Sequence, residues 1–225
     1  MKVVVSIGGS VLVPEVRSSR VAGYASVIGS LADAGHEVAV VVGGGPPARR
    51  YISAAREVGA NEIELDQLGI AVTRLNARLL TAALDERAVP VPVETHETAR
   101  TALRRGDIAV MGGTEVGQTT DAVATATAEY VEADLLVFAT SVDGVYDADP
   151  TEEASATKFD RITADRLVTL VAGMGVEAGR NAPIDLLAAK LIQRAGLRAV
   201  VIDGSDPETV ADAVRGDHAG TDVEP

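Results

Sequence analysis

The sequence of 225 residues contains no cysteine and no tryptophan, and its only lysines are Lys2, Lys158 and Lys190. The absence of cysteine excludes disulfides, thiolate catalysis and cysteine–zinc sites. No apolar run approaches the roughly 18 residues of a transmembrane helix. The first residues, MKVVVSIGGS, have too short an apolar stretch for a secretory signal. These absences predict a cytoplasmic protein that does not enter a membrane.

Positive charge is also scarce, since 33 acidic residues face 20 basic ones and the formal net charge is −13. Such a surface is expected to repel nucleic acids and anionic membranes. The acid excess, the few lysines and an aromatic content of 3% resemble proteins of salt-loving organisms, in which carboxylates maintain solubility in concentrated salt. The alternative is an ordinary acidic cytosolic protein.

Hydrophobic patterning predicts short apolar strands that alternate with helices. Strands are expected at 2–7, 37–42, 89–93, 107–113, 134–140 and 198–203, and helices at 18–35, 49–58, 65–87, 95–105, 121–132, 163–172, 183–195 and 207–214. The prolines of 89–93 place that strand near an edge. This order predicts an α/β fold, a three-layer sandwich with a central, mainly parallel sheet. No linker, repeat or low-complexity tract divides residues 1–225, so a single domain is expected.

Two of the predicted strands end in glycine-rich loops. Gly8, Gly9 and Ser10 follow the first strand, and Gly43 to Gly45 follow the second, with Arg49 one turn later. Ligands of such sheets lie beyond the carboxyl ends of the strands. Glycine lets backbone N–H groups approach phosphate oxygens, and an arginine adds a permanent charge. The pair of loops predicts two neighbouring anionic groups, although one such loop alone is more often a tight turn. Neither a dinucleotide fingerprint nor a Walker motif is present.

The loop GGTEVGQTTD at 112–121 places Thr119 and Thr120 just before Asp121 and a predicted helix. Hydroxyl groups and free N–H groups at a helix start suit a phosphate, and the carboxylate suits a magnesium ion or another cation. The alternative is that these side chains only cap the helix. In TSVDGVYDADP at 140–150, Tyr146 is placed to pack on a nucleotide base, although such a tyrosine is more often half-buried against the protein itself.

Six motifs together resemble the amino acid kinase superfamily and, within it, the uridylate kinases of archaeal type. They are IGGSVL, VVVGGGPPAR, LDQLGIAVTRLNA, GGTEVGQTTDAVA, TSVDGVYDADP and the C-terminal RGDHAGTDVEP. GGGPPAR alone would equally suit acetylglutamate kinases. The pairing of DQLG…N with TTDAVA favours uridylate kinases. The motifs span nearly the whole chain.

The resemblance implies an enzyme, a homohexamer, that transfers the γ-phosphoryl group of ATP to UMP in pyrimidine biosynthesis. Mg²⁺ would enter with ATP, and no metal-binding residue is assigned. The catalytic residues implied are Arg49 and Asp121. The residues implied for ATP are Gly8, Gly9, Ser10, Gly45, Arg49, Thr140, Tyr146 and Asp149. Those implied for UMP are Gly44, Asp66, Thr114, Glu115, Val116, Gly117, Gln118, Thr119 and Thr120.

One departure concerns Ser6, which occupies a position where many members of the superfamily have a phosphate-bridging lysine. Lys190 is a candidate substitute, but its pattern is more typical of a surface residue. Two alternatives follow. The first is another kinase of the superfamily, acting on acetylglutamate, carbamate or isopentenyl phosphate, although the histidine expected beside the glycine loop of the last type is absent. The second is a module that binds nucleotides without catalysis.

Overall fold

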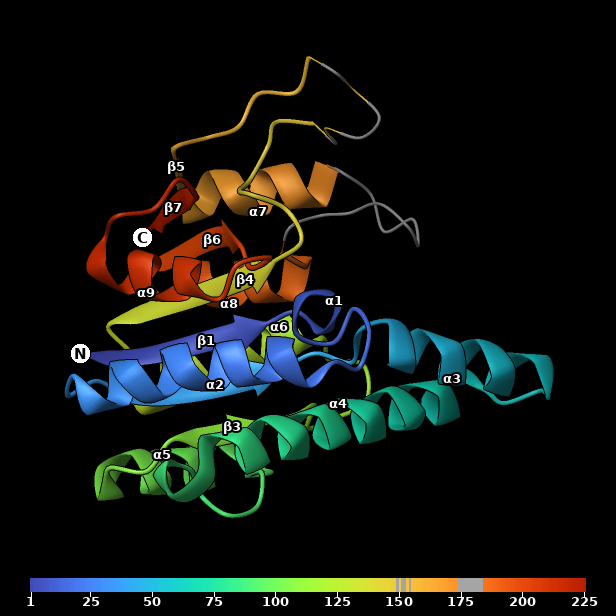
Figure 1. The fold of residues 1–225 in the computed structure, drawn as a ribbon. Coiled ribbons are helices and arrows are strands. Elements are labelled where there is room, and N and C mark those ends of the chain that lie inside the picture. The colour runs from blue at the N-terminus through green and yellow to red at the C-terminus, as the bar shows by residue number, and fades with distance from the viewer. Residues whose placement is uncertain (149, 151–152, 154, 174–183) are drawn as a thin grey trace.

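The computed structural model describes residues 1–148, 150, 153, 155–173 and 184–225 (Figure 1). The strands in these ranges are β1 Lys2–Ile7, β2 Glu37–Val42, β3 Ala109–Met111, β4 Leu135–Thr140, β5 Arg161–Thr163, β6 Ala199–Asp203 and β7 Thr221–Glu224. The helices are α1 Gly9–Leu12, α2 Ser18–Asp33, α3 Gly45–Glu57, α4 Glu62–Leu84, α5 His96–Arg105, α6 Thr120–Val131, α7 Ala164–Gly173, α8 Leu186–Ala195 and α9 Glu208–Arg215, with a 3₁₀ turn at Asp85–Arg87. None of these helices is long and apolar enough to cross a lipid bilayer.

The described strands form one sheet in the order β3-β2-β1-β4-β6-β7-β5. β1 lies at the centre of its parallel part, where Val3 pairs with Val38 of β2 and Leu135 of β4. β7 runs antiparallel to β6, and β5 runs parallel to β7. The predicted mainly parallel sheet is therefore confirmed. The four loops that follow β1, β2, β3 and β4 leave the same edge of the sheet, because these strands are parallel.

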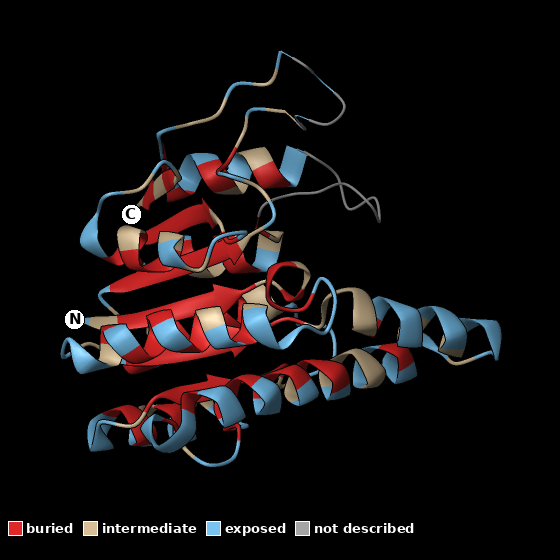
Figure 2. Cartoon of the chain, viewed as in Figure 1, coloured by how far each residue is buried: buried red, intermediate tan, exposed pale blue. Residues whose placement is uncertain are grey.

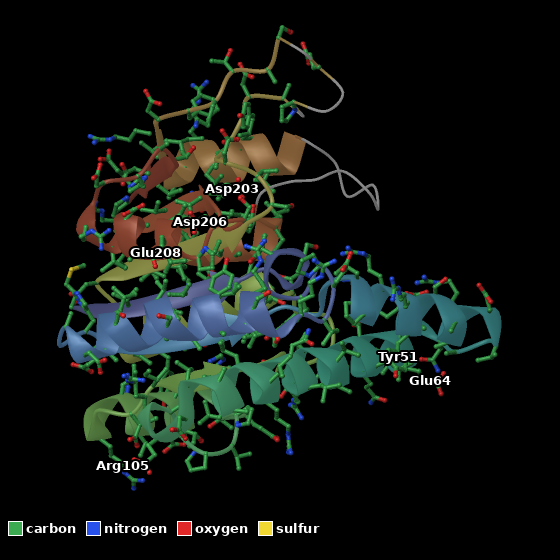
Figure 3. All side chains as sticks on the ribbon, viewed as in Figure 1. Tyr51, Glu64, Arg105, Asp203, Asp206 and Glu208 are labelled. Atoms are coloured by element: carbon green, nitrogen blue, oxygen red, sulfur yellow. The ribbon has the colours of Figure 1, made fainter. Side chains whose placement is uncertain are left out.

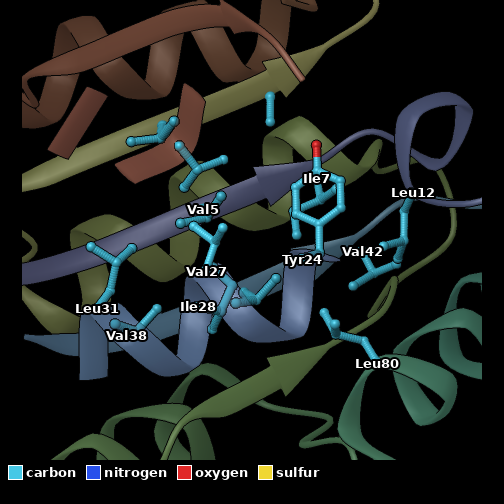
Figure 4. Close-up of a cluster of buried hydrophobic side chains, with 14 of the residues drawn as sticks. Val5, Ile7, Leu12, Tyr24, Val27, Ile28, Leu31, Val38, Val42 and Leu80 are labelled. Carbon is cyan, nitrogen blue, oxygen red and sulfur yellow. The ribbon is translucent and has the colours of Figure 1, made fainter. Parts of the chain in front are cut away.

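Alternate residues of each strand face two separate hydrophobic cores. Val3, Val5 and Ile7 of β1 point into a core covered by α1, α2, α4 and α9, part of which is drawn in Figure 4. Val4 points into the opposite core, which is covered by α5, α6, α7 and α8. Figure 2 shows the strands buried between helices whose outer faces are exposed. This arrangement confirms the three-layer sandwich.

The structure differs from the sequence prediction at several elements. The expected strand at 89–93 is reduced to single bridges, Ala88 with Ile108 and Val93 with Met111, because Pro90 and Pro92 have no N–H to donate. α3 begins at Gly45 rather than Arg49, since prolines are well tolerated in the first turn of a helix. The short β5 and β7 and the one-turn α1 were not predicted.

α3 and α4 pack side by side and project beyond the carboxyl ends of the strands (Figure 1). Ala48 is the only buried residue of α3. The projecting part of this pair carries the exposed residues Tyr51 and Glu64, which Figure 3 labels. α4 then returns along the sheet and buries Leu80 and Leu84 in the first core. The middle of α4 consequently passes the loops that follow β2 and β3.

Candidate functional site

The two glycine-rich loops lie backbone against backbone. A Cβ atom added at Gly9 would lie 2.1 Å from the nitrogen of Gly45 and 2.6 Å from the carbonyl carbons of Gly43 and Gly44. The Gly8 N–H donates to the carbonyl of Ala139 at 2.9 Å, which ties the first loop to the end of β4. The loops that the sequence placed near two anionic groups are thus in direct contact. Position 9 must be glycine because any larger side chain would overlap the backbone of the second loop.

The second loop presents N–H groups at the start of α3. Gly44 has right-handed helical angles, φ −80° and ψ −35°, and Gly45 has φ +62°, a left-handed conformation that favours glycine. Successive residues of these two hands direct their N–H groups into a shared concavity that suits an anion. Within the described ranges, neither of these two N–H groups donates to a protein acceptor. The positive end of the α3 dipole adds to the attraction.

Arg49 brings its guanidinium group to the first loop. Its Nη1 and Nη2 atoms each lie 3.5 Å from Oγ of Ser10, and the side chain is exposed. Lys190, the alternative cation, is exposed on α8. This location agrees with its interpretation as a surface residue. Arg49 is therefore the cation that the structure places beside the glycine loops.

The loop that follows β3 meets α4. Oδ2 of Asp66 accepts a hydrogen bond from the N–H of Gly117 at 2.8 Å, and Oγ1 of Thr114 lies 3.3 Å from Oε1 of Gln118. Thr119 caps α6 through the N–H of Ala122. The family resemblance implied that Asp66 and this loop bind one ligand, and the structure places them in contact.

A cavity of about 740 Å³ adjoins this loop and α4. Its wall includes Thr114, Glu115 and Val116, three residues of the predicted UMP segment. Arg74 and Arg78 from α4 also line it, and Nη1 of Arg74 lies 3.5 Å from a carboxylate oxygen of Glu94. The cavity therefore combines apolar wall with charges of both signs, and its volume falls in the range of small-molecule sites.

Asp121 lies at the start of α6, where it approaches the end of β1. Its Oδ1 accepts a hydrogen bond from Oγ of Ser6 at 3.0 Å, and Ser6 is only 1% exposed. Loss of hydration raises the pKa of Asp121 to about 7, and the nearby carboxylate of Asp185 contributes to the rise, while the Ser6 hydrogen bond opposes it. Ser6, at the position where many members of the superfamily have a lysine, therefore contacts a partly buried carboxyl group that keeps its proton at mildly acidic pH.

We expect Asp121→Asn to change how stability depends on pH. In the folded protein Asp121 retains its proton above the ordinary pKa near 3.8, so its contribution to the free energy of unfolding is complete below about pH 4 and is lost as pH rises to about 7. Asparagine removes that loss, which corresponds to on the order of 4 kcal/mol at most. Denaturant melts from pH 4 to 8 in concentrated potassium chloride measure the difference between variant and parent. A constant difference across this range would contradict the raised pKa.

The loop that follows β4 contains the remaining predicted ATP residues. Thr140 lies beside Gly8, and its Oγ1 accepts from the N–H of Val142 at 3.0 Å. The Tyr146 hydroxyl donates to Oδ1 of Asp143 at 2.7 Å, which raises the pKa of Tyr146 and lowers that of Asp143. Asp149 lies outside the described residues.

Sequence reasoning missed three residues of α4 that hold these loops. Asn76 donates to the carbonyls of Gly43 and Gly44, and Thr73 and Arg74 bond to the backbone of Gly113. Signals were present in the sequence, because all three residues lie in the motif LDQLGIAVTRLNA, although no role was assigned to them. Position 76 also falls on the apolar face of the predicted helix, where asparagine is out of place unless it has a partner. The partner could not be read from the pattern.

Comparison with known proteins agrees with this geometry. The profile described as the amino acid kinase family matches residues 1–203. The uridylate kinase of Haloarcula marismortui is 62% identical over 226 residues, covering 100% of this chain and 99% of its own, and that of Natronomonas pharaonis is 59% identical over 225 residues with the same coverage. A crystal structure of uridylate kinase from Archaeoglobus fulgidus has a TM-score of 0.90 and 45% identity, and the match covers 99% of this chain and 100% of that one. The predicted resemblance is confirmed, and the chain belongs to the amino acid kinase family.

Proposed function

We propose that this protein is a UMP kinase, a phosphotransferase that converts ATP and UMP to ADP and UDP. The observation that carries the proposal is the contact between two glycine-rich loops, with the guanidinium of Arg49 beside them and with the N–H groups of Gly44 and Gly45, which donate to no acceptor among the described residues. The names of the relatives that match over their full length support UMP as the acceptor.

The reaction is a direct transfer in line. An oxygen of the UMP phosphate attacks the γ-phosphorus of ATP, and the bond from that phosphorus to the β–γ bridging oxygen breaks as ADP leaves. The UMP phosphate is already ionised near neutral pH, since its second pKa is about 6, so no strong general base is needed. What the protein supplies is position and charge. The N–H groups of the glycine loops and Arg49 stabilise the negative charge on the transferring group.

Magnesium is proposed to enter with ATP. No three His, Cys, Asp or Glu side chains cluster in the described part of the chain. In sites of this kind Mg²⁺ is commonly held by one or two carboxylates together with substrate phosphates and water. The ion would neutralise charge on the β- and γ-phosphates. Asp121, which lies beside Ser6 at the end of β1, is proposed to hold the magnesium ion or to orient another cation near the transferring group.

Asp66→Ala is expected to weaken UMP binding by about 10-fold to 100-fold and to leave ATP affinity nearly intact. The reason is that Asp66 fixes the Gly117 N–H, and a hydrogen bond to a charged group contributes about 1.5–3 kcal/mol. Isothermal titration with each nucleotide measures the two affinities separately.

Glu57→Ala is the matched control, because Glu57 is an exposed carboxylate on α3 without a hydrogen bond or ion pair to any described residue. It should bind UMP as the parent does. An Asp66→Ala protein with unchanged UMP affinity would remove Asp66 from the acceptor site.

The same site admits two other functions that the assay must separate from the first. A kinase for acetylglutamate or isopentenyl phosphate would use the glycine loops but would not respond to UMP. A binding module would bind ATP and UMP in calorimetry without forming product. Separation of the nucleotides after incubation with magnesium tests the proposal, which requires UDP and ADP in equal amounts.

The remaining proposals concern the state of the protein in the cell. We place it in the cytoplasm, in pyrimidine nucleotide biosynthesis, as a homohexamer without nucleic-acid or membrane partners. The net charge of −13 supports adaptation to concentrated salt, where screening reduces repulsion between carboxylates. Light scattering in concentrated potassium chloride measures the assembly directly.

A further inference from the structure

Asn76 is a buried polar residue whose side chain serves a loop rather than its own helix. It is 5% exposed, and its Nδ2 atom lies 2.9 Å from the carbonyl oxygen of Gly43 and 3.2 Å from that of Gly44. Both hydrogens of the amide are therefore directed at consecutive carbonyls of the triple-glycine loop. A buried amide without hydrogen-bond partners destabilises a protein, so an asparagine on the apolar face of α4 is tolerated only because of these two partners.

The two hydrogen bonds determine which way the loop faces. Asn76 holds the carbonyls of Gly43 and Gly44 against α4. In a trans peptide the N–H points opposite to the carbonyl, so the N–H groups of these same two peptide groups turn away from the helix. These are the N–H groups of Gly44 and Gly45, which donate to no acceptor in the described ranges. A glycine loop that is not held by such hydrogen bonds has many conformations, and most of them would not direct both N–H donors to one point.

The same turn of α4 also holds the loop that follows β3. Oγ1 of Thr73 accepts from the N–H of Gly113 at 2.6 Å and donates to the carbonyl of Ile70 at 2.7 Å. Nε of Arg74 donates to the carbonyl of Gly113 at 3.1 Å. A rigid helical turn thus contacts one loop through Asn76 and the next through Thr73 and Arg74.

We infer that Asn76 is a positioning residue for phosphoryl transfer, which holds the triple-glycine loop with its N–H groups toward the phosphates. Thr73 likewise holds the loop that follows β3, which is proposed to bind UMP. This turn of α4 therefore sets the distance between the two bound nucleotides. The inference rests on the proposed function for the identity of the nucleotides. Transfer in line is sensitive to this distance, since a displacement of about 1 Å can reduce the rate about 100-fold.

The test compares Asn76→Leu and Asn76→Asp with Thr81→Val. Leucine has a similar volume without donors, and aspartate keeps the shape but presents oxygen to the two carbonyls. Thr81 is the matched control, because it lies on α4, is also 5% exposed, and its Oγ1 bonds to no described atom. Stability is measured by thermal melting, and kcat and KM are measured at a temperature where every variant is folded.

We expect both Asn76 variants to lower kcat about 100-fold and to weaken ATP binding in calorimetry, whereas Thr81→Val retains the kcat of the parent. Thr73→Val should instead raise the KM for UMP more than the KM for ATP. Folded Asn76 variants with the kcat and ATP affinity of the parent would overturn the inference. So would equal losses in the Thr81 and Asn76 variants, because both would then be general effects of altering α4.

The ATP titration separates this inference from the proposed function. If the parent binds ATP but transfers nothing to UMP, the proposed function fails. Weaker ATP binding by Asn76→Leu would still support the inference that Asn76 holds the triple-glycine loop for phosphate binding. If the parent does not bind ATP at all, the glycine loop is not an ATP phosphate site, and the inference that Asn76 positions it for that purpose is overturned as well.

Discussion

Arg49→Ala is expected to lower kcat by about 100-fold to 1,000-fold without weakening the fold. The guanidinium group lies beside Ser10 at the junction of the two glycine loops and is the cation that the described structure places there. Removing a preorganised charge from a transferring group has effects of this size. The side chain is exposed, so the free energy of unfolding should change by no more than about 0.5 kcal/mol. Steady-state rates and denaturant melts measure the two quantities.

The neighbouring Arg50 provides the control for charge alone. Arg50 is exposed and has no hydrogen bond or ion pair to a described residue, so Arg50→Ala changes the net charge equally and should keep the parent rate. If Arg49→Ala retains its turnover, or if both variants lose it equally, Arg49 has no direct role at the phosphates.

Gly9→Ala is expected to reduce turnover by about 100-fold and also to destabilise the protein. The added methyl group would lie 2.1 Å from the nitrogen of Gly45 and 2.6 Å from two carbonyl carbons, so the two loops must separate. Overpacking of this kind typically costs about 1–3 kcal/mol, and a separation near 1 Å misplaces the donors of the second loop. Thermal melting and kcat at a permissive temperature record the two effects.

Gly69→Ala adds the same methyl group inside α4, where the nearest atom is Cδ1 of Ile52 at 3.5 Å. Alanine is the better helix former by about 1 kcal/mol, so this variant should be slightly more stable and fully active. A Gly9→Ala protein that behaves like Gly69→Ala would show that the loops need not touch for catalysis.

The main elements of the fold were predictable from sequence because their signals are local. Valine-rich strands that end in glycine, and helices with apolar residues at regular spacing, predict the layers and the parallel sheet. β7 could not be predicted in this way, since its pairing with β6 is antiparallel and depends on the chain returning across the sheet. The segment 89–93 has the composition of a strand, but its prolines leave it with isolated bridges.

The loops of the candidate site were predictable from sequence, but the contacts that hold these loops in place were not. Gly9, Gly45 and Arg49 stand out because two strands that end in glycine, one of them followed by arginine, together favour a phosphate site over a pair of simple turns. The sequence did not show that Gly9 packs on Gly45, because a contact between loops far apart in the chain leaves no local pattern. Asn76 was equally hidden, because the pattern marks it as unusual but does not identify the carbonyls that it meets.

The resemblance supplied the name of the acceptor, and the structure supplies the reason to test it. The glycine loops and Arg49 by themselves indicate a phosphate site at the carboxyl ends of the strands of an α/β sheet. Asp66, Gly117 and the adjoining cavity form a second compartment for the proposed site, with a size suited to a nucleoside. UMP is the acceptor that the matched relatives' names support.

The most direct test of the central claim is the rate of ADP formation from ATP and magnesium with one acceptor at a time. UMP, CMP, acetylglutamate and isopentenyl phosphate are compared in concentrated potassium chloride and again in dilute buffer. We predict turnover with UMP that far exceeds turnover with acetylglutamate or isopentenyl phosphate, and loss of that turnover in dilute buffer. The proposal would be contradicted by a folded protein that forms ADP faster with acetylglutamate or isopentenyl phosphate than with UMP. It would also be contradicted by a folded protein that forms no ADP with any of the four acceptors.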